Sequence, residues 1–214
     1  RRMMNPAPGR RKVFLIDGTN YLFRAFFAIR GLANSRGFPT NAVFGFTNML
    51  LKVLREHAPD HVVMVFDAPG KTFRDNLFAE YKGHRPEIPE DLPPQIPVVR
   101  DLVRAFRIGQ LEVEGYEADD VIGTLVKRLA GEEVDTVIVT GDKDLLQLVG
   151  PGVSVLDTMK DIHYGREEVR GRFGVPPEQV VEVLGLAGDA TDNIPGVPGI
   201  GEKTAADLIR QFGD

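Results

Sequence analysis

Acidic residues directly follow three strongly apolar segments of this 214-residue chain. Asp17 follows VFLI (13–16), Asp67 follows VVMVF (62–66), and Asp142 follows TVIVT (136–140) and one glycine. Segments that are apolar throughout are typical of strands in a parallel sheet covered on both faces. The binding crevice of such a sheet lies at the carboxyl ends of its strands, so we expect the three carboxylates to meet there. Strand-end Asp residues are also common turn formers, which is the simpler alternative.

Six further acids stand in three short groups. They are Glu117, Asp119 and Asp120 in EGYEADD, Asp144 in GDKD, and Asp189 and Asp192 in GDATDN. Acids at a helix start complement the helix dipole, which would by itself explain the first group. Nine carboxylates in one crevice would repel one another, and divalent cations would relieve that repulsion. Oxygen ligands favour Mg²⁺ or Mn²⁺, and the number of acids favours two ions that clamp a phosphodiester.

Composition excludes several other kinds of site. The chain has no Cys, which excludes disulfides, thiolate catalysis and Cys-ligated zinc. No apolar run has the length of a membrane span and no signal peptide is recognisable, so we expect a cytoplasmic protein without a membrane partner. The net charge is −5, but without the nine acids 26 Lys and Arg face 22 acids, a net charge of +4. The acidic total therefore does not argue against nucleic acid.

Helical patterns separate the apolar segments. One covers 43–54, with Thr40 as its expected cap, another covers 121–129, and VSVLD at 153–157 indicates a further strand. This alternation predicts an α/β domain with right-handed crossovers.

The segment 70–97 interrupts the alternation and is long for a plain connection, which favours a functional role. Its first half interleaves cations and aromatic residues: Lys71, Arg74, Lys82 and Arg85 with Phe73, Phe78 and Tyr81. Such a pattern suits a single-stranded backbone and its stacked bases. A solvated amphipathic helix is the alternative, and for Phe73 and Phe78 a core position is favoured.

A glycine-rich turn, GVPGIGEKTA at 196–205, passes into an expected helix at 202–212. The glycines permit a tight turn in which backbone N–H groups at a helix start face a phosphate. This element resembles a helix-hairpin-helix, whose contacts to duplex DNA are independent of base sequence.

From about Lys12 to Asp214 the chain resembles the 5′-nuclease domain at the N-terminus of bacterial DNA polymerase I, within the flap endonuclease superfamily. The strings that carry the resemblance are DGTNYLFRAF, VMVFDAPGKTFR, YKGHRP, EGYEADDVIGTL, TGDKDLLQL and GDATDNIPGVPGIGEKTA. The resemblance implies a PIN-like, Rossmann-like core at 12–180 with a mostly parallel sheet, flanking helices and a helical arch at about 71–97. It also implies a helix-hairpin-helix region at 181–214, which we expect to be truncated, and residues 1–11 are expected to form a disordered basic tail.

The resemblance assigns roles residue by residue. Asp17, Asp67, Glu117 and Asp119 resemble ligands of a first metal ion, with Asp120 adjacent, and Asp142, Asp144, Asp189 and Asp192 resemble a second group. The cations that orient the 5′ strand and the scissile phosphate correspond to Arg24, Arg74, Lys82, Arg85 and Lys143, of which Arg24 and Lys82 are expected to act in catalysis. Tyr81 and Phe23 are expected at the DNA, and Phe23 replaces the usual Tyr. Duplex contacts are expected from Gly196, Val197, Gly199, Ile200, Gly201, Lys203 and Thr204, with K⁺ at the hairpin.

The implied activity is hydrolysis of DNA phosphodiesters at 5′ ends, nicks and 5′ flaps by a monomer that uses two or more Mg²⁺ ions, with Mn²⁺ as a substitute. The implied context is replication and repair, with a polymerase following in the same natural chain. Two alternatives stay open: a PIN-type ribonuclease on the same core, and a non-catalytic module that binds DNA structures. A phosphatase on a Rossmann-like core would also use strand-end Asp residues but would not need the hairpin.

Overall fold

A computed structural model describes residues 9–213, in which six strands form one sheet in the order β3-β2-β1-β4-β5-β6. The strands are β1 (Arg11–Asp17), β2 (His61–Val65), β3 (Gly109–Leu111), β4 (Val134–Val139), β5 (Val153–Asp157) and β6 (Ile162–Tyr164). The first five are parallel and β6 is antiparallel to β5, which confirms the predicted, mostly parallel α/β fold. After β1 the chain adds β2 and β3 on one side of β1, and it then adds β4, β5 and β6 on the other side. The β1–β4 boundary is therefore the switch point at which such sheets bind ligands.

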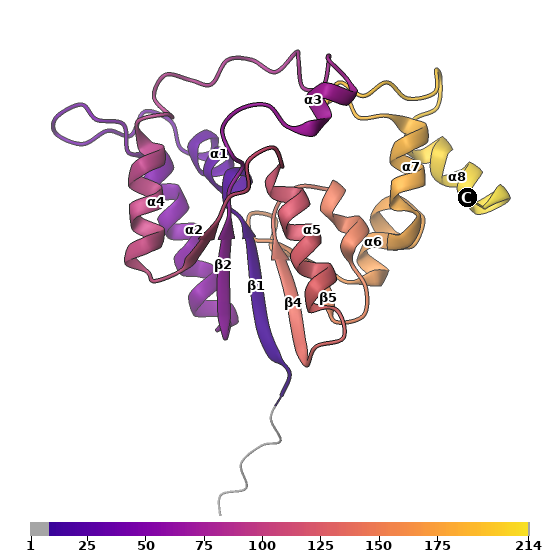
Figure 1. The fold of residues 1–214 in the computed structure, drawn as a ribbon, viewed down its shortest axis with the longest axis horizontal. Helices are drawn as coiled ribbons and strands as arrows, with labels where there is room; N and C mark the ends of the chain where they lie inside the picture. Colours follow the sequence, from indigo (N-terminus) through magenta and orange to yellow (C-terminus); the bar gives the residue numbers. More distant parts are fainter. Residues whose placement is uncertain (1–8, 214) are drawn as a thin grey trace, which may run out of the picture.

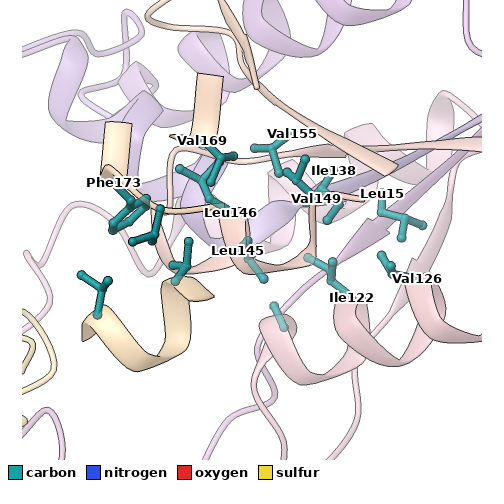
Figure 2. Close-up of a cluster of buried hydrophobic side chains, with 14 of the residues drawn as sticks. Leu15, Ile122, Val126, Ile138, Leu145, Leu146, Val149, Val155, Val169 and Phe173 are labelled. Atoms are coloured by element: carbon teal, nitrogen blue, oxygen red, sulfur yellow. The ribbon is translucent and has the colours of Figure 1, made fainter. Parts of the chain in front are cut away.

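Helices cover both faces of the sheet (Figure 1). One face carries α1 (Gly18–Ala28), α2 (Asn41–His57) and α4 (Gln95–Ala105), and the other carries α5 (Ala118–Leu129), α6 (Arg166–Phe173), α7 (Val180–Ala187), α8 (Glu202–Phe212) and the 3₁₀ helices η1 (Asp144–Leu148) and η2 (Pro177–Gln179). Side chains alternate along β1, so that Phe14 and Ile16 pack toward α1 and α2 whereas Leu15 packs toward α5. Each face of the sheet thus has its own hydrophobic core. Figure 2 shows the core on the α5 side, in which Leu15 lies near Ile122 of α5. Both cores include residues of β1 and β4, so they fix the carboxyl ends of these two strands relative to each other.

The structure corrects the boundary of the expected N-terminal tail. Arg11 is the first residue of β1, and Arg10 Nε donates to Asp135 Oδ1 at 2.7 Å. Residues 1–8 of that expected tail lie outside the described residues. Within the described part of the chain, no helix has both the length and the apolarity that crossing a bilayer requires.

The start of α2 is capped from another element. Thr40 occupies the expected N-cap position, but its side chain makes no capping hydrogen bond. Gln95 of α4 replaces it: its buried Oε1 accepts from the backbone N–H of Ala42 at 2.9 Å and of Val43 at 3.2 Å. Gln95 thereby satisfies two donors that the first turn of a helix leaves unpaired.

Residues 70–94, here called the strap, cross the carboxyl edge of the sheet from α3 (Phe73–Leu77) to α4 (Figure 1). The expected helical arch is wrong in its secondary structure, because between α3 and α4 the strap is turn and irregular backbone. The physical reason is its proline content, since proline removes a backbone donor and clashes with the preceding helical turn. The prolines concerned are Pro86, Pro89, Pro93 and Pro94.

Candidate active site

Asp17 and Asp67 stand where β1 and β2 end, as predicted. Asp17 is the last residue of β1 and the N-cap of α1, and its Oδ1 accepts from Asn20 N–H at 2.9 Å. Its Oδ2 accepts from the Thr140 hydroxyl at 3.0 Å, across the switch point between β1 and β4. Asp67 Oδ1 accepts from Ala118 N–H at 2.6 Å, which ties the end of β2 to the first turn of α5. Both carboxylates are thus fixed by neighbouring elements.

The N-terminus of α5 presents three acids with different surroundings. Glu117 is its N-cap and forms a capping box with Asp120. Lys82 of the strap donates to Glu117 Oε1 at 2.8 Å, and the Tyr81 hydroxyl donates to its Oε2 at 3.0 Å. Asp119 lies between these two acids in sequence, and it forms no ion pair with any described residue.

Arg74 of the strap binds Asp120 with two parallel hydrogen bonds of 2.6 and 2.8 Å. Asp120 Oδ2 also accepts the backbone N–H of Glu117 at 3.0 Å. In this structure the Asp120 carboxylate therefore holds the strap on α5, and its expected role as a metal ligand stays a prediction.

The GDKD loop and the hairpin loop meet through Lys143. Asp142 Oδ1 accepts the backbone N–H of Asp144 at 2.9 Å, which closes a tight turn before η1. Lys143 Nζ lies 2.8 Å from Asp189 Oδ2 and 3.7 Å from Asp144 Oδ1. Asp192 follows in the same hairpin loop and is bound by the strap: Arg85 donates to its Oδ1 at 2.7 Å, and its Oδ2, 3.0 Å from the Tyr81 hydroxyl, shares the single hydroxyl proton with Glu117.

The nine acids therefore divide into two groups. We call Asp17, Asp67, Asp119 and Asp142 the inner acids, because among residues 9–213 none of them forms an ion pair. The outer acids, Glu117, Asp120, Asp144, Asp189 and Asp192, each lie within ion-pair distance of a Lys or Arg.

The pKa values follow this division only in part, since burial also raises the pKa of one outer acid, Asp144, to about 6. Burial raises the pKa of Asp119 to about 8, and the charges of Asp17 and Asp142 add to the rise. Burial likewise raises the pKa of Asp17 to about 7, with repulsion from Asp67 and Asp142 in the same direction. For Asp120 and Asp189 burial acts in the same direction, but hydrogen bonds from Arg74 and Lys143 outweigh it and lower the pKa. Burial and mutual repulsion thus disfavour the ionised forms of Asp17 and Asp119, and a bound cation would relieve that penalty.

The donor set suits a hard divalent cation, although the side chains do not form a finished metal site. Across residues 9–213 no three His, Asp or Glu side chains converge closely enough to hold an ion as they stand. Asp17 is nevertheless buried and Asp119 half-buried, their carboxylates repel each other, and such pairs are stabilised when a cation binds between them. All donors are oxygens, which fits Mg²⁺ or Mn²⁺ better than softer metals.

The residues expected at DNA are distributed around these acids. Phe23 on α1 stacks on Phe27, with ring centroids 6.4 Å apart, and lines a cavity of about 450 Å³ together with Lys82 and inner acids such as Asp119. Tyr81 differs from the expectation: it is 9% exposed and its hydroxyl binds two acids, so its ring is not free to stack on a base.

The hairpin between α7 and α8 exposes most of its predicted contact residues. Gly199 adopts a positive φ of 81°, and Lys203 and Thr204 point to solvent from the first turn of α8. Ile200 departs from the expectation, because it packs against the core below α8. The exposed members of the predicted set are Val197, Gly199, Gly201, Lys203 and Thr204, and Gly196 is half-buried.

Asp157 is a site residue that the sequence reasoning missed. It ends β5, is buried, and accepts from Arg24 Nη2 at 2.7 Å. Two backbone N–H groups, of Met159 and Lys160, also donate to its Oδ1. The signal was available, since the predicted strand at 153–157 ends in this Asp just as the other strands end near theirs.

Two family models match the chain. The N-terminal resolvase-like domain of 5′-3′ exonucleases covers residues 12–174, and the C-terminal SAM fold of 5′-3′ exonucleases covers residues 175–214. A 5′-3′ exonuclease of Aquifex aeolicus is 41% identical over 203 residues, which are 95% of this chain and 70% of that protein. DNA polymerase I of Bacillus caldotenax is 51% identical over 208 residues, or 95% of this chain, but the chain spans only 24% of that polymerase.

Solved structures show the same fold. The T5 5′-exonuclease with bound zinc has a TM-score of 0.78 at 24% identity, with 95% of this chain and 76% of that chain covered. The catalytic core of Rad2 in complex with DNA has a TM-score of 0.61 at 21% identity and covers 96% of this chain and 63% of that chain. Sheet order and these likenesses define a PIN-like α/β fold. The chain belongs to the 5′-3′ exonuclease family, which confirms the resemblance found in the sequence.

Proposed function

We propose that this chain is a metal-dependent, structure-specific 5′-nuclease that hydrolyses DNA phosphodiesters at 5′ ends, nicks and 5′ flaps. The observation that carries the proposal is the group of inner acids. Three of them stand at or just after the ends of β1, β2 and β4, and the fourth lies in the first turn of α5. They line one cavity at the switch point, none of them forms an ion pair with another described residue, and two of them, Asp17 and Asp119, have raised pKa values.

Two Mg²⁺ ions, with Mn²⁺ as a substitute, fit this donor set. Asp17, Asp67, Glu117 and Asp119 would hold one ion, and Asp142, Asp144, Asp189 and Asp192 would hold the second, some of them through water. Ions held there would supply an activated water nucleophile and stabilise the charge that develops on the phosphate. The protein itself fixes the carboxylates through Asn20, Thr140 and the N–H of Ala118.

Positive side chains around the acids fit the phosphates of a DNA strand. Lys82, Arg85 and Arg24 lie beside the crevice and would orient the scissile phosphate and the 5′ strand, while Phe23 offers a ring to an unpaired base. These three cations are paired with acids, as Arg74 and Lys143 are, so all five would reach a phosphate only after their ion pairs open. The hairpin presents backbone N–H groups at the start of α8 to the duplex backbone, and a K⁺ ion there would assist.

The wider context is also part of the proposal. The similarity to bacterial DNA polymerases I supports a natural chain in which a polymerase follows this domain, acting as a cytoplasmic monomer in replication and repair. Division of the chain into a core at 12–180 and a DNA-binding hairpin region at 181–214 is supported by α7 and α8, which flank the hairpin.

The test is cleavage of a labelled 5′-flap DNA in Mg²⁺ and in EDTA, with Asp119→Asn as the inactivating variant. We expect cleavage by the wild type in Mg²⁺ alone, and loss of at least about a hundredfold in rate for the variant, because it removes an inner charge. Asp207→Asn on the exposed side of α8 is the matched control and should retain full activity.

Other outcomes would point to the alternatives. Flap binding in EDTA without turnover in Mg²⁺ or Mn²⁺ would indicate a module that only binds DNA structures. Faster cleavage of a single-stranded RNA than of the DNA flap would indicate a PIN-type ribonuclease. Full activity of Asp119→Asn would contradict the assignment of the inner acids.

A further inference from the structure

A chain of ion pairs connects the first residue of α8 with the loop between Asp142 and Asp144. Lys143 Nζ contacts Asp189 Oδ2 at 2.8 Å and Glu202 Oε1 at 3.4 Å. Glu202 Oε2 in turn accepts from Arg172 Nη1 of α6 at 3.0 Å. Glu202 thus binds Lys143 with one oxygen and Arg172 with the other. In sequence, Lys143 lies between the proposed catalytic acids Asp142 and Asp144.

Apolar packing determines which face of α8 is buried, and its inner face packs through Ala205, Ala206 and Ile209. Such packing is non-directional. Directional bonds stand at both ends of the helix, where Arg210 Nη1 donates to the Gly174 carbonyl at 3.2 Å near the C-terminus. An ion pair at the N-terminal end of the helix has a defined partner and a defined length. The pairs of Glu202 therefore fix the end of α8 that faces a phosphate against the loop that carries the acids.

The plain alternative is that Glu202 only complements the helix dipole and makes surface ion pairs of little value. The same helix offers a comparison. Asp207 pairs only with Arg210 of its own helix and reaches no other element. Glu202 differs because it is half-buried and because the hydrogen bonds from Arg172 and Lys143 lower its pKa against the opposing effect of burial.

We propose that Glu202 is a positioning residue that holds Lys143 and thereby sets the distance between the duplex-binding hairpin and the catalytic acids, so that it determines which phosphodiester is cut. The inference rests on the proposed nuclease function. When a duplex is held at the start of α8, the scissile phosphate reaches the acids at a separation that this connection defines. If the ion pair between Glu202 and Lys143 is weakened, neighbouring phosphodiesters of the same strand can also reach the acids and be cut.

The experiment compares Glu202→Ala with Asp207→Ala in single-turnover cleavage of a labelled 5′-flap DNA in Mg²⁺, with products resolved to single nucleotides. For Glu202→Ala we expect the single wild-type product to spread over adjacent positions, with a two- to fivefold lower rate at the main position, about the value of one ion pair. The dissociation constant for the flap in Ca²⁺ should change less than about twofold, because the hairpin backbone is untouched. Glu202→Asp, which keeps the charge, should restore most of the single product, and Asp207→Ala should behave as the wild type.

An unchanged product position and rate in Glu202→Ala, with the wild type active, would overturn this inference and leave the proposed function standing. A spread of products in Asp207→Ala as well would assign the effect to loosening of α8 in general, which also overturns it. No cleavage by the wild type would overturn the proposed function itself. If the melting temperature of Glu202→Ala is lower than that of Asp207→Ala, the comparison is made with Glu202→Gln, which keeps the side-chain shape but not the charge. A spread of products in Glu202→Gln supports the inference, and a single product at the wild-type position overturns it.

Discussion

The guanidinium of Arg24 lies against the backbone of Gly141, so closely that a β-carbon on Gly141 would overlap with it. The same guanidinium donates to Asp157 at 2.7 Å. Gly141 immediately precedes Asp142, and its N–H donates to Asn20 Oδ1 at 3.0 Å. The glycine therefore lets a buried ion pair and an inner acid occupy neighbouring positions.

Gly141→Ala should displace Arg24 from Asp157 or shift the loop that carries Asp142. We expect a loss of about 1–3 kcal/mol in the free energy of unfolding, as for other overpacked sites, together with slower flap cleavage. Urea unfolding measures the first effect. The control is Gly123→Ala on α5, where the new methyl would meet only Leu148 at 3.9 Å. Because Ala is the better helix former, that variant should gain up to about 1 kcal/mol. Equal stability of the two variants would contradict the prediction.

Metal-free protein should lose stability as the pH rises toward 8, because of Asp119. Its pKa is raised from 3.8 to about 8, so between these pH values the folded state keeps a proton that the unfolded state has released. The free energy of unfolding therefore falls as the pH rises through that range. Asp119→Asn removes this titration, and at about pH 8.5 in EDTA we expect the variant to exceed the wild type by roughly 2 kcal/mol.

Thermal unfolding over a pH series measures this difference. Addition of Mg²⁺ should raise the melting temperature of the wild type more than that of Asp119→Asn, because a ligand stabilises the state that binds it. Parallel pH profiles for the two proteins in EDTA would show that Asp119 does not titrate in this range.

A lysine at position 74 should not be able to replace the paired hydrogen bonds that Arg74 makes to Asp120. A Lys ammonium is a point charge and cannot donate two parallel bonds to one carboxylate. We expect Arg74→Lys to lose most of the coupling to Asp120, about 1 kcal/mol in a double-mutant cycle with Asp120→Asn. The cycle is measured by urea unfolding. A coupling energy for Lys equal to that for Arg would show that charge alone holds the strap on α5.

Asn193 should control how firmly the strap is closed. Its side chain donates to the Glu80 carbonyl at 2.8 Å, and the backbone N–H of Lys82 donates to the Asp192 carbonyl at 3.0 Å. Asn193→Ala removes the first bond, and we expect tryptic cleavage between Lys82 and Gly83 to become about fivefold faster. Asn34→Ala is the control, since Asn34 bonds only within the loop between α1 and α2. Equal cleavage rates in the two variants would contradict the prediction.

The fold was predictable where apolar runs were long enough to show a pattern. The four strands expected from VFLI, VVMVF, TVIVT and VSVLD are confirmed as β1, β2, β4 and β5. β3 and β6 have three residues each, too few for a period to emerge, and they went unrecognised. The cap of α2 was also not predictable, because Gln95 comes from another helix.

Within the site, local sequence indicated which acids stand at strand ends but not which cations bind them. Lys82 and Glu117 are 35 residues apart, and Arg85 and Asp192 are 107 apart. Such pairings depend on the path of the strap, which its prolines make irregular. The division into inner and outer acids is therefore visible only in three dimensions. The roles of these residues in metal and DNA binding stay predictions.

Closure of the strap on the hairpin loop has a consequence for the order of folding. The bond between Asn193 and Glu80 joins positions 113 residues apart, and bringing such distant segments together costs conformational entropy. The pairing of β1 with β4 spans a similar distance but buries a large apolar area, whereas the strap contacts are polar and half-exposed. The sheet must therefore form first. We expect a refolding chain to regain its helical signal before its crevice is assembled, so that the proposed cleavage activity returns in the last step of folding.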